Sequence, residues 1–178
     1  MEPPIHRYAI ALGSNRRHGR HGSPARVIAA ALAALAAAGV EVAAISPTIH
    51  TAALGPAGRG FANAAAIVRT PLDPPALLAL LKRTERAFGR RRGRRWGPRV
   101  LDLDIILWSG GRWPPGQRRA RPGALAVPHA AFAGRGFVVR PLAAVAPAWR
   151  VAGGHTVAQI KARLDRRKRM DARARPAL

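Results

Sequence analysis

The chain has 178 residues, of which 31 are Lys or Arg and 8 are Asp or Glu, and its formal net charge at pH 7 is +23. A chain of this length is expected to fold as one domain, and a hydrophobic content of 48% is enough for a sizeable core. It has no cysteine, which excludes disulfides, Cys-based zinc sites and thiolate catalysis and suits a cytoplasmic location.

The positive charge is concentrated in two blocks. Residues 82–99 hold nine basic residues and one acidic residue, and residues 161–178 hold eight basic and two acidic residues. Blocks of this kind attract polyanions, either nucleic acid or a phosphorylated small molecule, and charge alone does not choose between them. We interpret residues 161–178 as a basic C-terminal tail.

Hydrophobic patterns predict strands and helices from the start of the chain. A buried strand is expected over 8–12, ending in a turn at 13–15. A helix follows, with Ser23 as its N-cap and Gly39 as its terminator. The uncharged stretch 27–40 within it is too short to span a bilayer, so we interpret this helix as part of the scaffold.

The pattern continues with two strands, a helix and a further strand, which we place at 40–49, 62–69, 73–89 and 100–108. The order is β-α-β-β-α-β, which predicts a ferredoxin-like α/β (α+β) fold, with an antiparallel sheet backed by two helices on one face. Short apolar segments at 125–127 and 137–140 predict extra strands near the C-terminus.

Two carboxylates interrupt the last of these core strands. Asp102 and Asp104 are two residues apart, so strand alternation places both on one face, roughly 6.5 Å apart, while Leu101, Leu103 and Ile105 face the other way. Like charges this close favour a cation between them, and oxygen ligands on a rigid strand suit Mg²⁺. Surface salt bridges to the abundant arginines are the alternative.

The loop that precedes this strand is rich in arginine. Residues 89–99 carry six arginines on a glycine-punctuated segment. Guanidinium groups bind phosphate oxygens in pairs, so a polyphosphate held there by arginine and chelated through Mg²⁺ to the two aspartates would suit phosphoryl transfer. A solvated basic loop or a nucleic-acid contact remains the alternative.

Two further segments carry weaker signals. His129 and Arg135 add a possible acid–base group and another cation, although a lone histidine is more often structural. Phe61 and Asn63 offer an aromatic ring and an amide at the start of a strand, and Trp96 and Phe137 are two more rings. An amide can read the donor and acceptor edge of a heterocycle, and rings can stack on it.

Residues 95–106 (RWGPRVLDLDII) resemble the signature of the 6-hydroxymethyl-7,8-dihydropterin pyrophosphokinase family. The resemblance covers about residues 7–160, which we take as the catalytic domain, and it implies the ferredoxin-like fold. It also implies transfer of pyrophosphate from ATP to the pterin hydroxymethyl oxygen, with release of AMP, in folate biosynthesis. The flanking segments that match, in the family's order, are 11–15, 54–56, 61–64, Glu85 with 89–90, 127–129 and 135–137.

The resemblance assigns roles residue by residue. It implies that two Mg²⁺ ions are held by Asp102 and Asp104. The residues it implies for catalysis together with these aspartates are Arg90 and Arg99. The residues it implies for ATP binding are Glu85, Arg90, Arg95, Trp96, Arg99, His129 and Arg135. Those it implies for pterin binding are Thr51, Leu54, Phe61, Asn63, Trp96 and Phe137. Lys82 stands where glutamine can occur in the family.

The expected partners are therefore ATP and a reduced pterin. We expect a monomer that binds no membrane and touches nucleic acid only nonspecifically. The alternative from another functional class is a basic ferredoxin-like RNA-binding module without catalysis, because such sheets can present aromatic rings to bases. The low aromatic content of 5% and the two aspartates oppose that alternative.

Overall fold

The computed structural model describes residues 3–51, 60–89, 100–116 and 123–174. The core elements in chain order are β1 (His6–Ser14), α1 (Pro24–Ala37), β2 (Glu41–Ile45), β3 (Ile49–Thr51), β4 (Phe61–Thr70), α2 (Pro74–Ala87) and β5 (Asp102–Trp108). After them come the 3-10 turn η1 (Phe132–Gly134) and the helices α3 (Gly136–Val145) and α4 (Val157–Ala174).

The sheet has the strand order β2-β4-β1-β5, with β3 paired to β4 beside β2, and each described pairing is antiparallel. Strand β1 therefore lies inside the sheet, and β5 lies at the end of the strand order. This is the ferredoxin-like order that the β-α-β-β-α-β pattern predicts, so the predicted core is confirmed.

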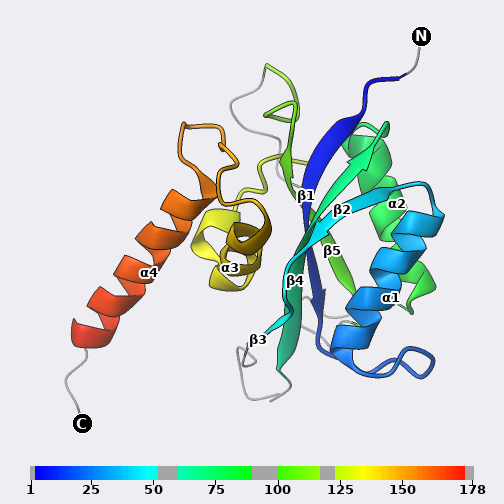
Figure 1. The fold of residues 1–178 in the computed structure, drawn as a ribbon, viewed down its shortest axis with the longest axis horizontal. Coiled ribbons are helices and arrows are strands. Elements are labelled where there is room, and N and C mark those ends of the chain that lie inside the picture. Colours follow the sequence, from blue (N-terminus) through cyan, green and yellow to red (C-terminus); the bar gives the residue numbers. More distant parts are fainter. Residues whose placement is uncertain (1–2, 52–59, 90–99, 117–122, 175–178) are drawn as a thin grey trace.

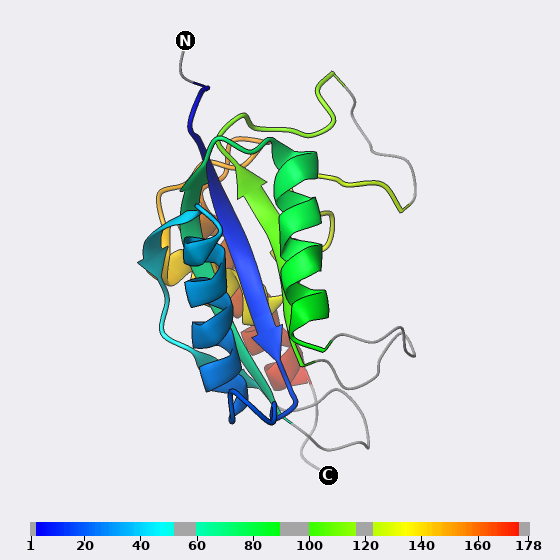
Figure 2. The same cartoon turned by 90° about the vertical axis from the view of Figure 1, so that its right-hand side faces the viewer.

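Helices cover both faces of this sheet. Helices α1 and α2 lie side by side on one face, and α3 and α4 lie on the opposite face (Figures 1 and 2). One core cluster fills the space beneath α1 and α2, and it includes Leu35, Leu81 and Leu103 of β5, all fully buried. A second cluster joins α3 to the sheet and contains Val139 and Ile106. The sheet is therefore the middle layer of a three-layer sandwich, with helices on both faces.

The ends of α1 and α2 follow the signals in the sequence. Gly39 and Gly89 adopt φ of 84° and 83°, in the left-handed region that favours glycine after a helix. The side chain of Asp73 caps the start of α2, because its Oδ1 accepts a hydrogen bond of 2.8 Å from the Ala76 N–H. The predicted bounds of both helices are confirmed to within a few residues.

The strand predicted over 40–49 is divided into β2 and β3. Between them, the Ser46 N–H donates to the Ala65 carbonyl, and the Ser46 Oγ accepts from the Ala65 N–H at 2.9 Å. The Ser46 side chain thus accepts the hydrogen bond that a strand carbonyl would otherwise accept. The next residue, Pro47, has no N–H with which to continue the pairing. The chain bends here, and β3 continues beside β4 at the far end of the sheet.

The expected extra C-terminal strands are wrong. Residues 137–140 lie in α3, and the described residues beyond β5 form helices and isolated bridges such as Trp113 with Val127. A four-residue apolar run fits a buried strand and a buried helix equally well, so periodicity could not separate them. The predicted turn at 13–15 also begins later, because β1 continues to Ser14.

The stretch that we interpreted as a basic tail, 161–178, continues α4 as far as Ala174. The apolar side of this helix, at Val157, Ile160 and Leu164, packs against the second core cluster. None of the helices in the described ranges combines the length and the apolar content that a membrane crossing needs.

Candidate active site

The predicted site residues from different strands meet in one row across the sheet. Asn63 of β4 lies opposite Gly13 of β1, and Gly13 lies opposite Asp102 of β5. A Cβ placed on Gly13 would lie 3.6 Å from Asn63 Oδ1 and 3.9 Å from Asp102 Cβ. The amide and the carboxylate therefore flank a position without a side chain, on backbones about 10 Å apart.

The next row on the same face has small residues. Ala65 of β4 lies opposite Ala11 of β1, and Ala11 lies opposite Asp104 of β5. Ala11, Ala65 and Gly13 thus form a floor of small residues between the amide side and the carboxylate side, and Ala65 is 2% exposed beneath α3.

Asp102 and Asp104 point to one face of β5, as the sequence predicts. Leu101, Leu103 and Ile105 lie in the core cluster beneath α1 and α2, so the two aspartates that alternate with them face the α3 side. Both aspartates are partly exposed, and the side chain of Asp104 retains 36% of its exposed surface. The carboxylate pair is thus built on a rigid strand and remains open to a ligand.

His129 is held against the edge of β5. The His129 N–H donates a hydrogen bond of 3.0 Å to the carbonyl of Ile106, at an irregularity where β5 shifts its register against β1. The His129 Nδ1 accepts from the Ala131 N–H at 3.3 Å. The backbone of the predicted histidine therefore lies beside the strand that carries the aspartates, two residues beyond Asp104.

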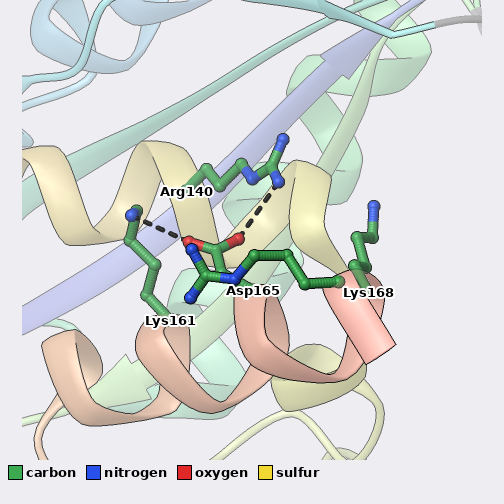
Figure 3. A pocket seen from close by; sticks show the side chains of 5 residues that line it. Arg140, Lys161, Asp165 and Lys168 are labelled. Atoms are coloured by element: carbon green, nitrogen blue, oxygen red, sulfur yellow. Dashed lines mark hydrogen bonds and ion pairs between the residues drawn. The ribbon is translucent and has the colours of Figure 1, made fainter. Parts of the chain in front are cut away.

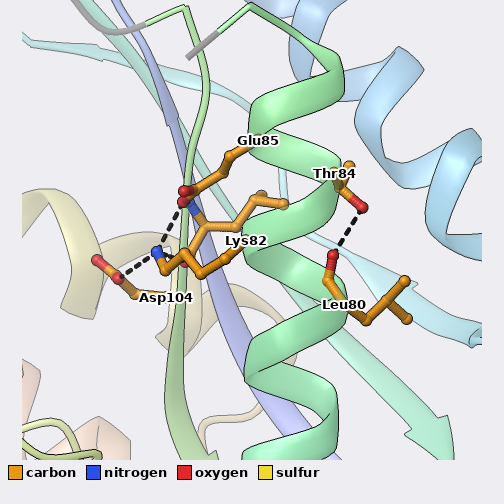
Figure 4. A network of polar contacts seen from close by, with 6 residues as sticks. Leu80, Lys82, Thr84, Glu85 and Asp104 are labelled. Carbon is orange, nitrogen blue, oxygen red and sulfur yellow. Dashed lines mark hydrogen bonds and ion pairs between the residues drawn. The ribbon is translucent and has the colours of Figure 1, made fainter. Parts of the chain in front are cut away.

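A polar network from α2 grips the same strand (Figure 4). Glu85 is fully buried, and its Oε1 accepts a hydrogen bond of 2.7 Å from the Leu103 N–H. Lys82 donates to Glu85 Oε1 at 2.7 Å and to the Leu103 carbonyl at 2.8 Å. Its ammonium also lies 3.6 Å from Asp104 Oδ1.

This network gives Glu85 a structural role beside the one that the resemblance implies. Its carboxylate is fully buried in the ligand-free chain, and its predicted part in ATP binding stays a prediction. The carboxylate holds the peptide of Leu103, the residue between the two aspartates. Glu85 therefore holds β5, the strand that carries both aspartates, from the side of α2.

Three predicted pterin-binding residues lie together on β3 and β4. The Asn63 Nδ2 donates a hydrogen bond of 3.0 Å to the Thr51 Oγ1. Thr51 lies opposite Phe61 in the strand pairing, and Phe61 is partly exposed. Asn63 is only 5% exposed, so its amide is already oriented by Thr51 before any ligand arrives.

Arg135 and Phe137 lie at the start of α3. Arg135 is the N-cap residue, and its carbonyl accepts hydrogen bonds from the N–H groups of Val138 and Val139. Phe137 packs against the core cluster that contains Ile106. Phe137 thus lies in a helix rather than in the strand that we predicted over 137–140, and Arg135 precedes that helix.

Five predicted site residues lie outside the described residues: Leu54, Arg90, Arg95, Trp96 and Arg99. Their expected roles rest on the sequence. Sequence reasoning missed the importance of two described positions, Gly13 and Lys82. The signal for Lys82 was its place three residues before Glu85, which puts both side chains on the same side of α2.

A second polar region lies between α3 and α4 (Figure 3). It is an open hollow of about 500 Å³, lined by Arg140, Lys161, Asp165, Lys168 and Arg169. Asp165 binds Lys161 at 3.0 Å and Arg140 at 3.1 Å. The hydrogen bonds from Lys161 and then Arg140 hold the pKa of Asp165 below its ordinary value.

The carboxylate pair fits a magnesium ion. The described residues hold no group of three or more His, Cys, Asp or Glu side chains that could enclose a metal. Mg²⁺ does not require one, because it is commonly held by one or two carboxylates and completes its six ligands with water and phosphate oxygens. Asp102 and Asp104 supply this donor set on an open face.

The chain is similar to known proteins over most of its length. The family model described as 7,8-dihydro-6-hydroxymethylpterin-pyrophosphokinase matches residues 9–147. Relatives named 2-amino-4-hydroxy-6-hydroxymethyldihydropteridine pyrophosphokinase include that of Methylorubrum extorquens, 38% identical over 88% of this chain and 92% of the relative. That of Pseudomonas aeruginosa is 38% identical over 89% of this chain and 91% of the relative.

A relative with the same name from Synechocystis is 37% identical over 72% of this chain. The matched part covers 63% of that relative's length. The family model covers the strands that carry the carboxylate pair and the candidate pterin residues, and it ends just after α3. The chain therefore belongs to the 7,8-dihydro-6-hydroxymethylpterin-pyrophosphokinase family.

Proposed function

We propose that this chain transfers the pyrophosphoryl group of ATP to the hydroxymethyl oxygen of 6-hydroxymethyl-7,8-dihydropterin, giving AMP and the pterin diphosphate in folate biosynthesis. Family membership supports this reaction. The observation that carries it is the row Asn63–Gly13–Asp102, which places an amide that can read a heterocycle and the Asp102 carboxylate on either side of a position without a side chain.

Asp102 and Asp104 would hold Mg²⁺, and we propose two ions. When bound, Mg²⁺ would supply positive charge that offsets the negative charge developing on the phosphate oxygens during transfer. The chain's own contribution is rigidity: β1 pairs with β5 on one side, and Lys82 and Glu85 grip the Leu103 peptide from α2. The carboxylates thus need little reorganisation when ATP binds.

We propose that the phosphates are bound by arginine and histidine side chains. Arg90, Arg95 and Arg99 would clamp them from the loop before β5, because guanidinium groups pair with phosphate oxygens. His129 and Arg135 would meet them from the segment that runs along the edge of β5 into α3. The His129 N–H bond to Ile106 supports this placement.

The pterin would lie toward β3 and β4. Asn63, oriented by Thr51, would hydrogen-bond the heterocycle, and the backbone at Leu54 would complete its polar edge. The rings of Phe61 and Phe137 would stack on its faces. Trp96 would cover it and exclude water, which protects ATP from hydrolysis.

We further propose a single catalytic domain over 7–160, followed by a basic segment over 161–178, and a cytoplasmic monomer. The alternative of an RNA-binding module is not supported. Such modules bind RNA on an open sheet face, but here α3 packs on the face opposite α1 and α2. Asp102 and Asp104 on that same face would also repel a phosphate backbone.

The experiment is AMP formation. Purified protein is incubated with ATP, Mg²⁺ and 6-hydroxymethyl-7,8-dihydropterin, and AMP and the pterin diphosphate are measured by chromatography. We expect the two products in equal amounts, and none when the pterin or Mg²⁺ is omitted. A folded protein that forms no AMP under these conditions, or that forms AMP without the pterin, contradicts the proposed function.

A further inference from the structure

The side chain of Lys82 lies among three oxygen atoms at the back of the candidate site (Figure 4). Its ammonium donates to Glu85 Oε1 at 2.7 Å and to the Leu103 carbonyl at 2.8 Å. The third oxygen, Asp104 Oδ1, lies 3.6 Å away. That distance is too long for a good hydrogen bond, so the interaction with Asp104 is mainly an attraction between charges.

The first two contacts fix where the ammonium lies. Glu85 is fully buried, and a buried carboxylate requires a cation, so Lys82 is held to it by a strong restraint. Glu85 Oε1 and Lys82 together bind the N–H and the carbonyl of Leu103, as a neighbouring strand would. Lys82 therefore cannot move away from β5 without breaking both contacts.

The third contact brings a positive charge to the candidate cation site. A divalent cation on Asp104 would lie within a few ångströms of the ammonium, and the two positive charges would repel each other. The side chains of Lys82 and Asp104 are 31% and 36% exposed, so water screens the repulsion in part. The phosphates of ATP carry enough negative charge to overcome the remainder.

We propose that Lys82 is a positioning residue with two effects on the carboxylate pair: it orients Asp104, and it weakens the binding of a divalent cation in the absence of nucleotide. The cation is then bound mainly together with ATP. This inference rests on the proposed function, because it takes Asp102 and Asp104 as the residues that hold the cation.

The test is Mn²⁺ binding without nucleotide, measured by electron paramagnetic resonance of free Mn²⁺. Lys82→Gln keeps a hydrogen-bond donor near Glu85 and removes the charge. We expect it to bind Mn²⁺ about tenfold more tightly than the wild type, since a unit charge about 5 Å from a divalent cation contributes at least this much in water. Lys82→Arg, which retains the charge, should bind Mn²⁺ like the wild type.

Arg83→Gln is the matched control. Arg83 is the next residue of α2, is exposed and carries the same charge, so its loss changes the net charge equally. We expect its Mn²⁺ affinity to stay within about twofold of the wild type, because distant surface charges are screened. Equal Mn²⁺ affinity in Lys82→Gln and the wild type, including no detectable binding by either, overturns the inference.

A second variant covers the case in which Lys82→Gln fails to fold because Glu85 loses the Lys82 ammonium. Lys82→Gln with Glu85→Gln removes the buried carboxylate together with that ammonium, and we expect Mn²⁺ to bind about threefold more tightly than in the wild type. Unchanged affinity in the folded double variant overturns the inference as well.

The AMP assay separates this inference from the proposed function. A wild type that forms AMP while Lys82→Gln leaves Mn²⁺ binding unchanged overturns only the role of Lys82. A wild type that forms no AMP overturns the proposed function, whatever the Mn²⁺ titrations give.

Discussion

Two polar networks in the described part of the chain differ in their balance of charged groups. Between α2 and β5, one ammonium, that of Lys82, lies next to two carboxylates, those of Glu85 and Asp104. Between α3 and α4, one carboxylate, that of Asp165, lies next to two cations, those of Lys161 and Arg140. Among these named groups, carboxylates outnumber cations in the first network and cations outnumber carboxylates in the second.

Burial separates the two regions further. Glu85 has no exposed surface, whereas the Asp165 side chain is 22% exposed and its partners Arg140 and Lys161 are 48% and 44% exposed. Three of the eight acidic residues, Glu85, Asp102 and Asp104, lie at or behind the candidate site, and the two aspartates are on the strand β5. The comparison teaches that burial, more than the number of charged groups, separates the network behind the candidate site from the exposed one between α3 and α4.

The largest effect should come from the carboxylate pair. Asp102→Asn or Asp104→Asn should lower kcat by about 10³-fold or more, because the site loses a ligand for the cation that offsets phosphate charge. The free energy of unfolding should change little, since like charges are removed from one face. Initial rates of AMP formation and urea unfolding measure both quantities.

Asp165→Asn is the control from the opposite region, with the same change of carboxylate to amide. Its kcat should equal that of the wild type. Near-normal turnover by Asp102→Asn or Asp104→Asn would show that the two regions do not differ as we describe.

The next effect concerns stability. Glu85→Ala should lower the free energy of unfolding by about 3 kcal/mol, because the Leu103 N–H and the Lys82 ammonium both lose a buried, charged partner. Asp165→Ala should cost less than about 1 kcal/mol, as exposed ion pairs do. Urea unfolding of both variants compares them, and equal losses would contradict the contrast in burial.

Asn63→Ala should weaken pterin binding by about 30-fold, since the heterocycle would lose a hydrogen-bond partner that Thr51 holds in place. The affinity for a non-hydrolysable ATP analogue should be unchanged, because Asn63 lies on the side of the floor away from Asp102. Calorimetric titration with each ligand separates the two. A parallel loss of both affinities would mean that the floor is not divided in this way.

Gly13→Ala tests the floor itself. The added Cβ would make ordinary contacts with Asn63 and Asp102, and the φ of Gly13 is not positive, so stability should change by less than about 1 kcal/mol. The methyl group would lie where the ligands meet, and kcat/KM should fall by about tenfold. Unchanged kcat/KM would place the reacting atoms elsewhere.

The smallest effect is the dependence of stability on pH at Asp165. Its pKa in the folded chain lies below its ordinary value of 3.8, so the ionised carboxylate adds stability above that pH. This contribution is lost as the pH falls through the lower pKa. The difference in free energy of unfolding between wild type and Asp165→Asn should be constant above about pH 5 and shrink below about pH 4.

Urea unfolding from pH 2 to pH 7 measures this difference. A difference that grows on acidification would have the wrong sign for a lowered pKa.

Local signals in the sequence predicted most of the sheet. The alternation around Asp102 and Asp104, the helix expected over 73–89 and the terminator Gly39 each depend on a few neighbouring residues, and each was found close to where it was expected. The apolar run at 137–140 was misread because a buried helix and a buried strand have the same composition over four residues.

The candidate site could be predicted only in part. Each residue type was visible, but the row of Asn63, Gly13 and Asp102 depends on the register of three strands, which no local pattern contains. The burial of Glu85 likewise depends on how α2 packs against β5. The sequence therefore indicated the residue types of the candidate site. The packing showed that Lys82 and Glu85 of α2 hold the strand that carries the aspartates.

The most direct measurement is a crystal structure with Mn²⁺, a non-hydrolysable ATP analogue and the pterin, in which anomalous scattering locates the metal. We expect at least one Mn²⁺ about 2.2 Å from an oxygen of both Asp102 and Asp104 and bound to the phosphates, with the pterin beside Asn63. Metal and phosphates bound away from these two aspartates would contradict the account.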